Sequence, residues 1–169
     1  MMGSLLSSLQ LSGESMTSTD FLFRVHLTPF QLGLMSGDQR VQITPDPEVG
    51  NPIPAFLSTL ESLLQGPGER NLTMKGRVES WTLNFVTKND NTTLQVSTFS
   101  NGQSHNARVV FETAQETLDL VQTIWRSFRI VQSTVTEKEW TSCWEYTFPE
   151  AELDNLMVDL QDAQAQAEI

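Results

Sequence analysis

The sequence predicts a single α+β domain in which one mainly antiparallel sheet carries about three helices on one face. Three observations lead to this fold class. Segments that alternate apolar and polar residues follow one another, apolar stripes with helical spacing interrupt them irregularly, and no long linker divides the chain. Strands that run together, with helices dispersed among them, favour an antiparallel sheet covered on one side. At 169 residues the chain is also long enough to bury a core without disulfides or metals.

The ordered domain is expected to span residues 20 to 160. Residues 1 to 19 are rich in serine and nearly uncharged, which indicates either a flexible leader or a short helical turn docked on the domain. The flexible leader is the preferred interpretation, because termini are seldom ordered without burial. Residues 161 to 169 contain glutamine, alanine and acidic residues without an apolar stripe, so we expect this acidic tail to fray.

The beginning of the domain predicts two strands and two loops. Residues 21 to 27 alternate apolar and polar side chains, as in a half-buried strand. Pro29 disfavours continuation of that strand, and the glycines around residues 34 to 38 indicate a loop. Residues 40 to 44 form a short second strand, and the four prolines between residues 45 and 54 exclude a regular element there.

A core-facing helix is predicted next, over residues 56 to 64. Its phenylalanine and leucines recur with the spacing of one helix face, and the Gly-Pro-Gly sequence at residues 66 to 68 ends it. Residues 72 to 78 then form either a separate strand or the beginning of a longer strand that bends before residue 81.

The central unit, residues 81 to 130, combines three strands with a helix. Alternating apolar side chains predict paired strands over residues 81 to 87 and 92 to 99, with turn residues between them. After a second break, residues 108 to 112 form a short apolar strand. This unit is expected to organise the rest of the domain.

The helix of the central unit is predicted to begin with a capping box formed by Thr113 and Glu116, whose side chains can each bond an unpaired backbone N–H. Its apolar stripe consists of Leu118, Val121, Trp125 and Phe128. We therefore expect Trp125 to pack on the sheet face that carries Trp81 and Phe85.

The end of the domain predicts one more strand and a final helix. Four aromatic residues between positions 140 and 148 share one parity of an alternating pattern, which indicates a strand with an aromatic face. Pro149 suits the first turn of a helix, and the acidic residues that follow it suit the positive end of the helix dipole. Leucine and methionine residues between positions 153 and 160 form its apolar stripe. The predicted order is strand, strand, helix, about four strands, helix, strand, helix.

The formal charge of the chain is −11, from 21 acidic against 10 basic residues. Contact with nucleic-acid phosphates is therefore repulsive over most of the surface, and no nucleic-acid partner is expected. The imbalance is concentrated after Lys138, the last basic residue, which eight acidic residues follow. This distribution indicates either an ordinary solvated surface or a face that attracts a basic partner.

Cys143 is the only cysteine, so no internal disulfide is expected and a reducing, cytoplasmic location fits best. The apolar stretches are much shorter than the ~20 residues that a membrane span needs. No positive charge precedes the leucines near the N-terminus, as it does in a secretory signal. The sequence therefore predicts neither a membrane partner nor export.

No catalytic set can be identified in the sequence. A thiol nucleophile needs a base, and the histidines available are His26 and His105. Cys143 shares one parity of its predicted strand with Glu145, whose negative charge disfavours a thiolate. The spacing of histidine, cysteine and acidic residues matches no metal motif, and no glycine-rich phosphate loop is present. We expect no enzymatic activity, no cofactor and no metal.

The one candidate site is an aromatic and acidic surface. Trp140 and Trp144 lie on the predicted strand, bordered by Glu137, Glu139 and Glu145. Aromatic residues among charged ones are typical of protein interfaces, although both tryptophans also suit a buried core. We expect a basic protein partner at this surface.

In size, charge, single cysteine, element order and lack of an active-site motif, residues 20 to 160 resemble the small acidic α+β proteins that bacteria keep as immunity partners of secreted toxins. The resemblance implies a cytoplasmic protein that masks a basic partner. Two other hypotheses are a structural or assembly subunit and a small-ligand carrier or enzyme. The latter would have a pocket between the sheet and the helices, for which Arg24 and His26 are the candidate polar residues.

Overall fold

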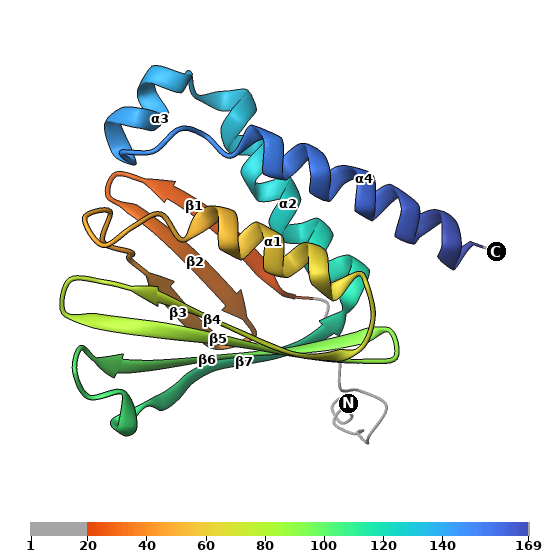
Figure 1. The fold of residues 1–169 in the computed structure, drawn as a ribbon, viewed down its shortest axis with the longest axis horizontal. Coiled ribbons are helices and arrows are strands. Elements are labelled where there is room, and N and C mark those ends of the chain that lie inside the picture. Colours follow the sequence, from red (N-terminus) through yellow and green to blue (C-terminus); the bar gives the residue numbers. More distant parts are fainter. Residues whose placement is uncertain (1–19, 169) are drawn as a thin grey trace, which may run out of the picture.

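Two antiparallel sheets and four α-helices make up residues 20 to 168, the part of the chain that the computed structural model describes (Figure 1). The predicted α+β class is confirmed, whereas the prediction of a single sheet with three helices is wrong. The leader predicted over residues 1 to 19 lies outside the described residues.

The first sheet consists of β1 (Leu22–Leu27), β2 (Phe30–Ser36) and β3 (Gln39–Ile43), which pair in sequence order through two tight turns. Both predicted strands of this region are confirmed as β1 and β3. Along β1 the side chains alternate as expected, because Phe23 is buried and Arg24 is exposed. The buried side chains of the three strands join the core that the helices share.

β2 occupies a stretch for which the sequence predicts a loop at residues 34 to 38. Gly33 is tolerated within the strand because the imidazole of His26 covers it: a Cβ at Gly33 would lie 3.3 Å from His26 Nε2. Leu32 and Leu34, on either side of Gly33, are almost fully buried. Burial of these leucines outweighs the low strand preference of glycine, so the loop prediction is wrong for residues 34 to 36. Gly37 and Asp38 do form a turn, in which Gly37 has a φ of 60°.

The second sheet contains four strands in sequence order, β4 (Gly68–Lys75), β5 (Glu79–Lys88), β6 (Asn91–Ser100) and β7 (Arg108–Glu116). β5 and β6 confirm the predicted strand pair, and Asn89 supplies the left-handed residue of their turn, with a φ of 56°. A single turn of 3-10 helix, Ser104–Asn106, precedes β7. Of the two alternatives for residues 72 to 78, the separate strand is confirmed, because β4 ends at Lys75 and β5 begins at Glu79.

β7 is longer than predicted and takes the place of the expected helix start. Thr113 lies within the strand, where its hydroxyl is 3.0 Å from that of Ser36 and accepts a hydrogen bond from Gln115 Nε2 at 3.0 Å. Pairing with β6 continues to the end of β7, so α2 (Thr117–Thr134) begins only after Glu116. The predicted capping box is therefore wrong, because strand pairing and these buried hydroxyl contacts already satisfy the groups that it would have bonded.

The two sheets meet where β3 lies beside β7, and one side chain replaces the missing backbone pairing. Gln39 Nε2 donates to the Glu112 carbonyl at 2.8 Å, and the Glu112 N–H donates to Gln39 Oε1 at 2.9 Å. The amide of Gln39 thus imitates the paired donor and acceptor of an antiparallel strand. This contact joins the edge of the first sheet to the edge of the second. The alternation of apolar and polar residues within single strands cannot predict that the strands divide into two sheets.

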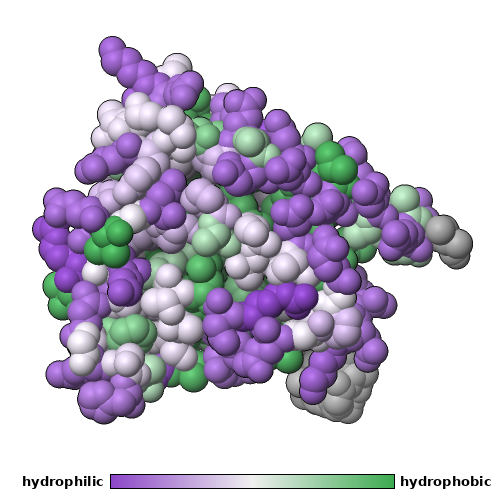
Figure 2. Space-filling model, in the orientation of Figure 1, coloured by the Kyte–Doolittle hydropathy of each residue, from purple (hydrophilic) through white to green (hydrophobic). Residues whose placement is uncertain are grey.

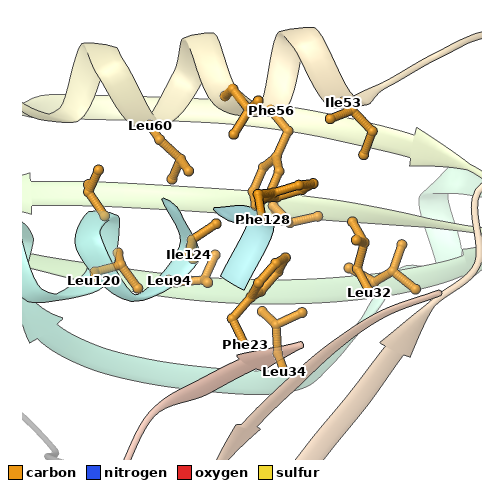
Figure 3. Close-up of a cluster of buried hydrophobic side chains, with 14 of the residues drawn as sticks. Phe23, Leu32, Leu34, Ile53, Phe56, Leu60, Leu94, Leu120, Ile124 and Phe128 are labelled. Atoms are coloured by element: carbon orange, nitrogen blue, oxygen red, sulfur yellow. The ribbon is translucent and has the colours of Figure 1, made fainter. Parts of the chain in front are cut away.

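Helices cover the inner side of both sheets and share one core with them. α1 (Ile53–Leu63) confirms the helix predicted over residues 56 to 64, and α2 buries one of its faces against β1 and the second sheet. Figure 3 shows Phe56 of α1 and Phe128 of α2 directed toward Phe23 of β1. Their ring centroids lie 5.7 and 5.9 Å from that of Phe23.

Trp125 does not pack on the sheet face predicted for it. Its half-buried indole donates from Nε1 to the Leu153 carbonyl of α4 (Glu150–Ala167) at 3.0 Å, and the Arg129 guanidinium lies 5.3 Å from its ring centroid. The core stripe of α2 is formed by Leu120, Val121, Ile124, Phe128 and Val131. Because α2 packs on the sheets with one face and on α4 with another, its apolar spacing alone does not assign Trp125 to either.

α4 lies against α1 and α2, and its C-terminal end projects beyond the sheets (Figure 1). Its leucines at positions 153, 156 and 160 are buried, as the predicted stripe requires. The helix continues to Ala167, whereas the sequence predicts fraying from residue 161. None of the helices between residues 20 and 168 is long and apolar enough to cross a membrane.

Candidate functional site

The segment predicted to be an aromatic strand, residues 140 to 148, belongs in part to a short helix, α3 (Glu137–Cys143). A capping box starts this helix: Glu139 N donates to Thr136 Oγ1 at 3.1 Å, and Thr136 N donates to Glu139 Oε1 at 2.7 Å. The strand prediction is wrong because α3 takes up residues 137 to 143, and residues 144 to 149 form neither helix nor strand. An even spacing that includes a step of four, as from Trp140 to Trp144, also fits a helix. The Thr-x-x-Glu pattern before them is the sequence signal that identifies the helix.

Trp140 and Trp144 are buried in the core and offer no surface to a partner. Each of the two side chains is 1% exposed. Trp144 stacks on Phe30 with ring centroids 4.3 Å apart, and Trp140 meets Phe30 edge-on at 5.6 Å. The expectation that these tryptophans belong to an exposed interface is corrected: they anchor α3 to the first sheet through large buried aromatic surfaces.

The polar atoms of this aromatic cluster are bonded to the chain around it. Trp140 Nε1 donates to the Tyr146 carbonyl at 2.8 Å, and Trp144 Nε1 donates to Asn51 Oδ1 at 3.3 Å. The Tyr146 hydroxyl donates to the Pro47 carbonyl at 2.6 Å. Asn51 and Pro47 belong to the proline-rich loop before α1. The segment that contains α3 is therefore fixed by contacts 93 and 99 residues away in the sequence.

The three glutamates of the predicted site do lie on the surface, and exposed carboxylates continue along α4. Hydrophilic side chains cover most of α4 in Figure 2. We name as the acidic helical face the exposed residues Glu137, Glu139, Glu145, Glu150, Asp154 and Asp162.

Two basic residues reduce the charge of the acidic helical face. Lys138 lies between Glu137 and Glu139 on α3, and Arg129 of α2 forms an ion pair with Asp154 of α4. Six carboxylates against these two cations leave a net charge of −4. The helical side of the molecule is therefore acidic, which is the property expected of a surface that attracts a basic partner.

Two carboxyl groups, those of Glu61 on α1 and Asp159 on α4, lie next to each other where the two helices pack. The hydrogen bond of Glu61 to Asp159 raises the pKa of Glu61, and burial and the like charge of Asp159 raise it further. Two carboxyl groups so placed are most stable when they share a proton. The sequence gives no signal for this contact, because residues 61 and 159 become neighbours only when the helices pack.

Cys143 lies in a hollow of about 500 Å³ that is also lined by Phe30, Trp81 and Trp144. The thiol is half-buried, and its sulfur is 3.9 Å from the Ser142 hydroxyl. None of the described residues that line this hollow is a histidine. The arrangement therefore gives Cys143 no histidine base to activate it as a nucleophile.

Arg24 and His26, the candidate polar residues of a ligand pocket, line a groove between β1 and α2. No carboxylate of the described residues lines this groove with them. A catalytic pocket requires polar groups that converge on a reacting atom, and the groove lacks the carboxylate that this hypothesis demands.

Comparison of the chain with models of protein families, with curated proteins and with solved structures finds no match. The resemblance to immunity proteins accordingly stays a hypothesis.

Proposed function

We propose that the chain is a protein-binding module whose acidic helical face binds a basic surface of a partner protein, in the manner of an immunity protein that masks a toxin. The observation that carries the proposal is the set of exposed carboxylates on α3, on α4 and at Glu145 between them. A buried aromatic cluster holds the α3 end of this set. A cytoplasmic location is part of the same proposal, because a single cysteine suits a reducing compartment.

Rigid support of α3 favours binding. Trp140 and Trp144 fix the helix by burial, and the capping box of Thr136 and Glu139 fixes its first turn. A surface that is already ordered loses little conformational entropy when a partner binds, so more of the interaction energy appears as affinity. Glu137 and Glu145 are thereby presented at defined positions on either side of the buried tryptophans.

Electrostatic attraction is expected to speed association with a basic partner. Complementary charge raises association rates and makes them sensitive to salt, because charges interact over only about 8 Å at physiological ionic strength. The same charge of −11 repels nucleic acids and anionic membranes, so a basic protein is the proposed partner.

The test is a pull-down from the native host at low and high salt, with a variant of the acidic helical face. Glu137→Gln, Glu145→Gln and Glu150→Gln together remove three charges from this face. Glu139 and Asp154 are left unchanged, because Glu139 caps α3 and Asp154 pairs with Arg129. We expect the wild-type chain to retain a protein partner at low salt and the triple variant to lose it.

A control variant with the same change in charge separates local from global electrostatics. Glu48→Gln, Glu69→Gln and Glu112→Gln alter exposed residues outside α3 and α4, and none of the three carboxylates accepts a hydrogen bond in the described residues. This control should retain the partner. Recovery of no protein at either salt, or equal recovery by both triple variants, contradicts the proposal.

A further inference from the structure

A groove of about 500 Å³ runs between β1 and α2, on a different part of the molecule from α3. β1 is the edge strand of its sheet, and α2 covers that edge: Ser127 Oγ donates to the Phe23 carbonyl at 2.6 Å. The strand edge is thus occupied by the helix at this point. Any segment that binds here must lie over the seam between strand and helix and not extend the sheet.

An arginine lines each side of the groove, and a histidine lies beside one of them. Arg24 and His26 come from β1, Arg126 comes from α2, and all three are exposed. Neither arginine forms an ion pair with a described carboxylate. No acidic side chain lines the groove in the described part of a chain whose net charge is −11. The groove therefore has the opposite sign to the molecule as a whole.

The groove also exposes apolar surface between its charges. Leu22 of β1 is 44% exposed, and Ile130 of α2 is 56% exposed. Exposed aliphatic side chains next to guanidinium groups that have no carboxylate partner among residues 20 to 168 suit a ligand with both carboxylates and apolar side chains. When such a ligand binds, its carboxylates pair with the guanidinium groups and its apolar side chains cover Leu22 and Ile130.

The outer surface of the first sheet, next to the groove, also combines a basic residue with apolar side chains. Strand pairing places Leu22 beside Met35 and Met35 beside Arg40, so that Arg40 lies in the same row of the outer face. Arg24 is followed across the sheet by Gly33 and Gln42. These rows contain no aspartate or glutamate.

We propose that this groove binds a short acidic segment with apolar side chains, contributed by a protein partner. Between Leu22 and His26 the wall of the groove is about 13 Å long, at ~3.3 Å per strand residue, which admits about four extended residues. A nucleic acid or an anionic membrane would also bring the acidic remainder of the molecule close to a large negative surface, where repulsion opposes binding. A short peptide segment avoids most of that repulsion.

The proposal is independent of the acidic helical face and is tested with peptides of defined composition. The probe is a fluorescein-labelled peptide that alternates glutamate and leucine, and fluorescence anisotropy measures its binding to the whole chain at low and high salt. We expect binding at low salt that weakens as salt is added. A peptide with glutamine in place of glutamate, and one with serine in place of leucine, should each bind at least about tenfold more weakly, since each lacks one of the two interactions.

Arg24→Gln with Arg126→Gln should raise the Kd for the acidic peptide about tenfold, because two charge interactions are lost together. Arg77→Gln with Arg108→Gln is the matched control, since both arginines are exposed and neither lines the groove. Circular dichroism checks that each variant is folded. Four results would each overturn the proposal: no peptide binding at low salt, equal binding of the glutamine peptide, equal loss in the control variant, or tighter binding to phosphatidylserine vesicles or an oligothymidine.

Discussion

Trp140 shows how one buried side chain sets the position of the acidic helical face. Its ring contacts Phe30 and Phe148 edge-on, at centroid distances of 5.6 and 5.0 Å, and its Nε1 donates to the Tyr146 carbonyl. The Trp140 indole therefore connects α3 to β2 and to the segment that follows α3. The sequence places Trp140 correctly among aromatic residues, but the direction in which it points follows from the helix and not from the parity of a strand.

Trp140→Ala should lower the free energy of unfolding by about 3–5 kcal/mol, because a large cavity replaces a fully buried indole. Trp125→Ala is the matched comparison, since that indole is half-buried and rests on α4, and it should cost clearly less. Urea denaturation of both variants measures the difference. Equal losses of stability would show that burial does not distinguish the two tryptophans.

At the scale of elements, α3 and β2 show where short-range patterns mislead. The spacing from Trp140 to Trp144 fits a strand and a helix equally, and the capping box that begins at Thr136 is the signal for the helix. Gly33 suggests a loop until His26 on the neighbouring strand is seen to cover it. Longer elements such as α1, β5 and β6 are predicted correctly, because their apolar spacing extends over many residues and a competing pattern is absent.

Thr136→Ala removes the side chain that caps α3 and should destabilise the protein by about 1 kcal/mol. The loss should also weaken binding of a basic partner, because Glu137 and Glu139 lie in the turn that the cap orders. Thr141→Ala provides the control: among the described residues, its exposed hydroxyl bonds backbone carbonyls of α3 itself, those of Glu137 and Lys138. Urea midpoints that fall equally for the two alanine variants would contradict a capping role for Thr136.

The contact between α1 and α4 predicts a pH dependence through Glu61. Its pKa is raised in the folded protein, first by the hydrogen bond to Asp159, then by burial and like charge. The folded state therefore holds a proton that the unfolded state has lost once the pH exceeds the ordinary glutamate pKa. Because the folded state binds more protons in this window, the free energy of unfolding falls as pH rises through it.

Glu61→Gln should reduce that fall, because an amide keeps a hydrogen bond to Asp159 without the repulsion between two carboxylates. Urea midpoints measured from about pH 4 to about pH 7 give the slope for each protein. Glu69→Gln, at an exposed position on β4, controls for the loss of one charge. If the slope of Glu61→Gln matches that of wild type, the shared proton makes no difference to stability.

On the scale of the whole molecule, two surfaces of opposite sign lie on one core. The acidic helical face lies on α3, on α4 and on the segment between them, and the groove with Arg24 and Arg126 lies between β1 and α2. The acidic surface can be inferred from the sequence, since its charges follow one another after Lys138. The groove cannot, because Arg24 and Arg126 are distant in sequence and meet only through the packing of α2 on β1. The division into two sheets cannot be inferred from the sequence either, because Gln39 and Glu112, which join the sheets, are 73 residues apart.

Gln39→Ala tests whether the contact between β3 and β7 joins the two sheets. The substitution removes both hydrogen bonds to the Glu112 backbone, at 2.8 and 2.9 Å, and should cost about 1–3 kcal/mol. The Glu112 amide, which donates to Gln39 Oε1, should then exchange its hydrogen faster than the amides of β6, whose pairing is unchanged. Gln42→Ala, at an exposed position on the outer face of β3, should leave both quantities as in wild type. Unchanged exchange at Glu112 in Gln39→Ala would mean that apolar packing holds the sheets together without this side chain.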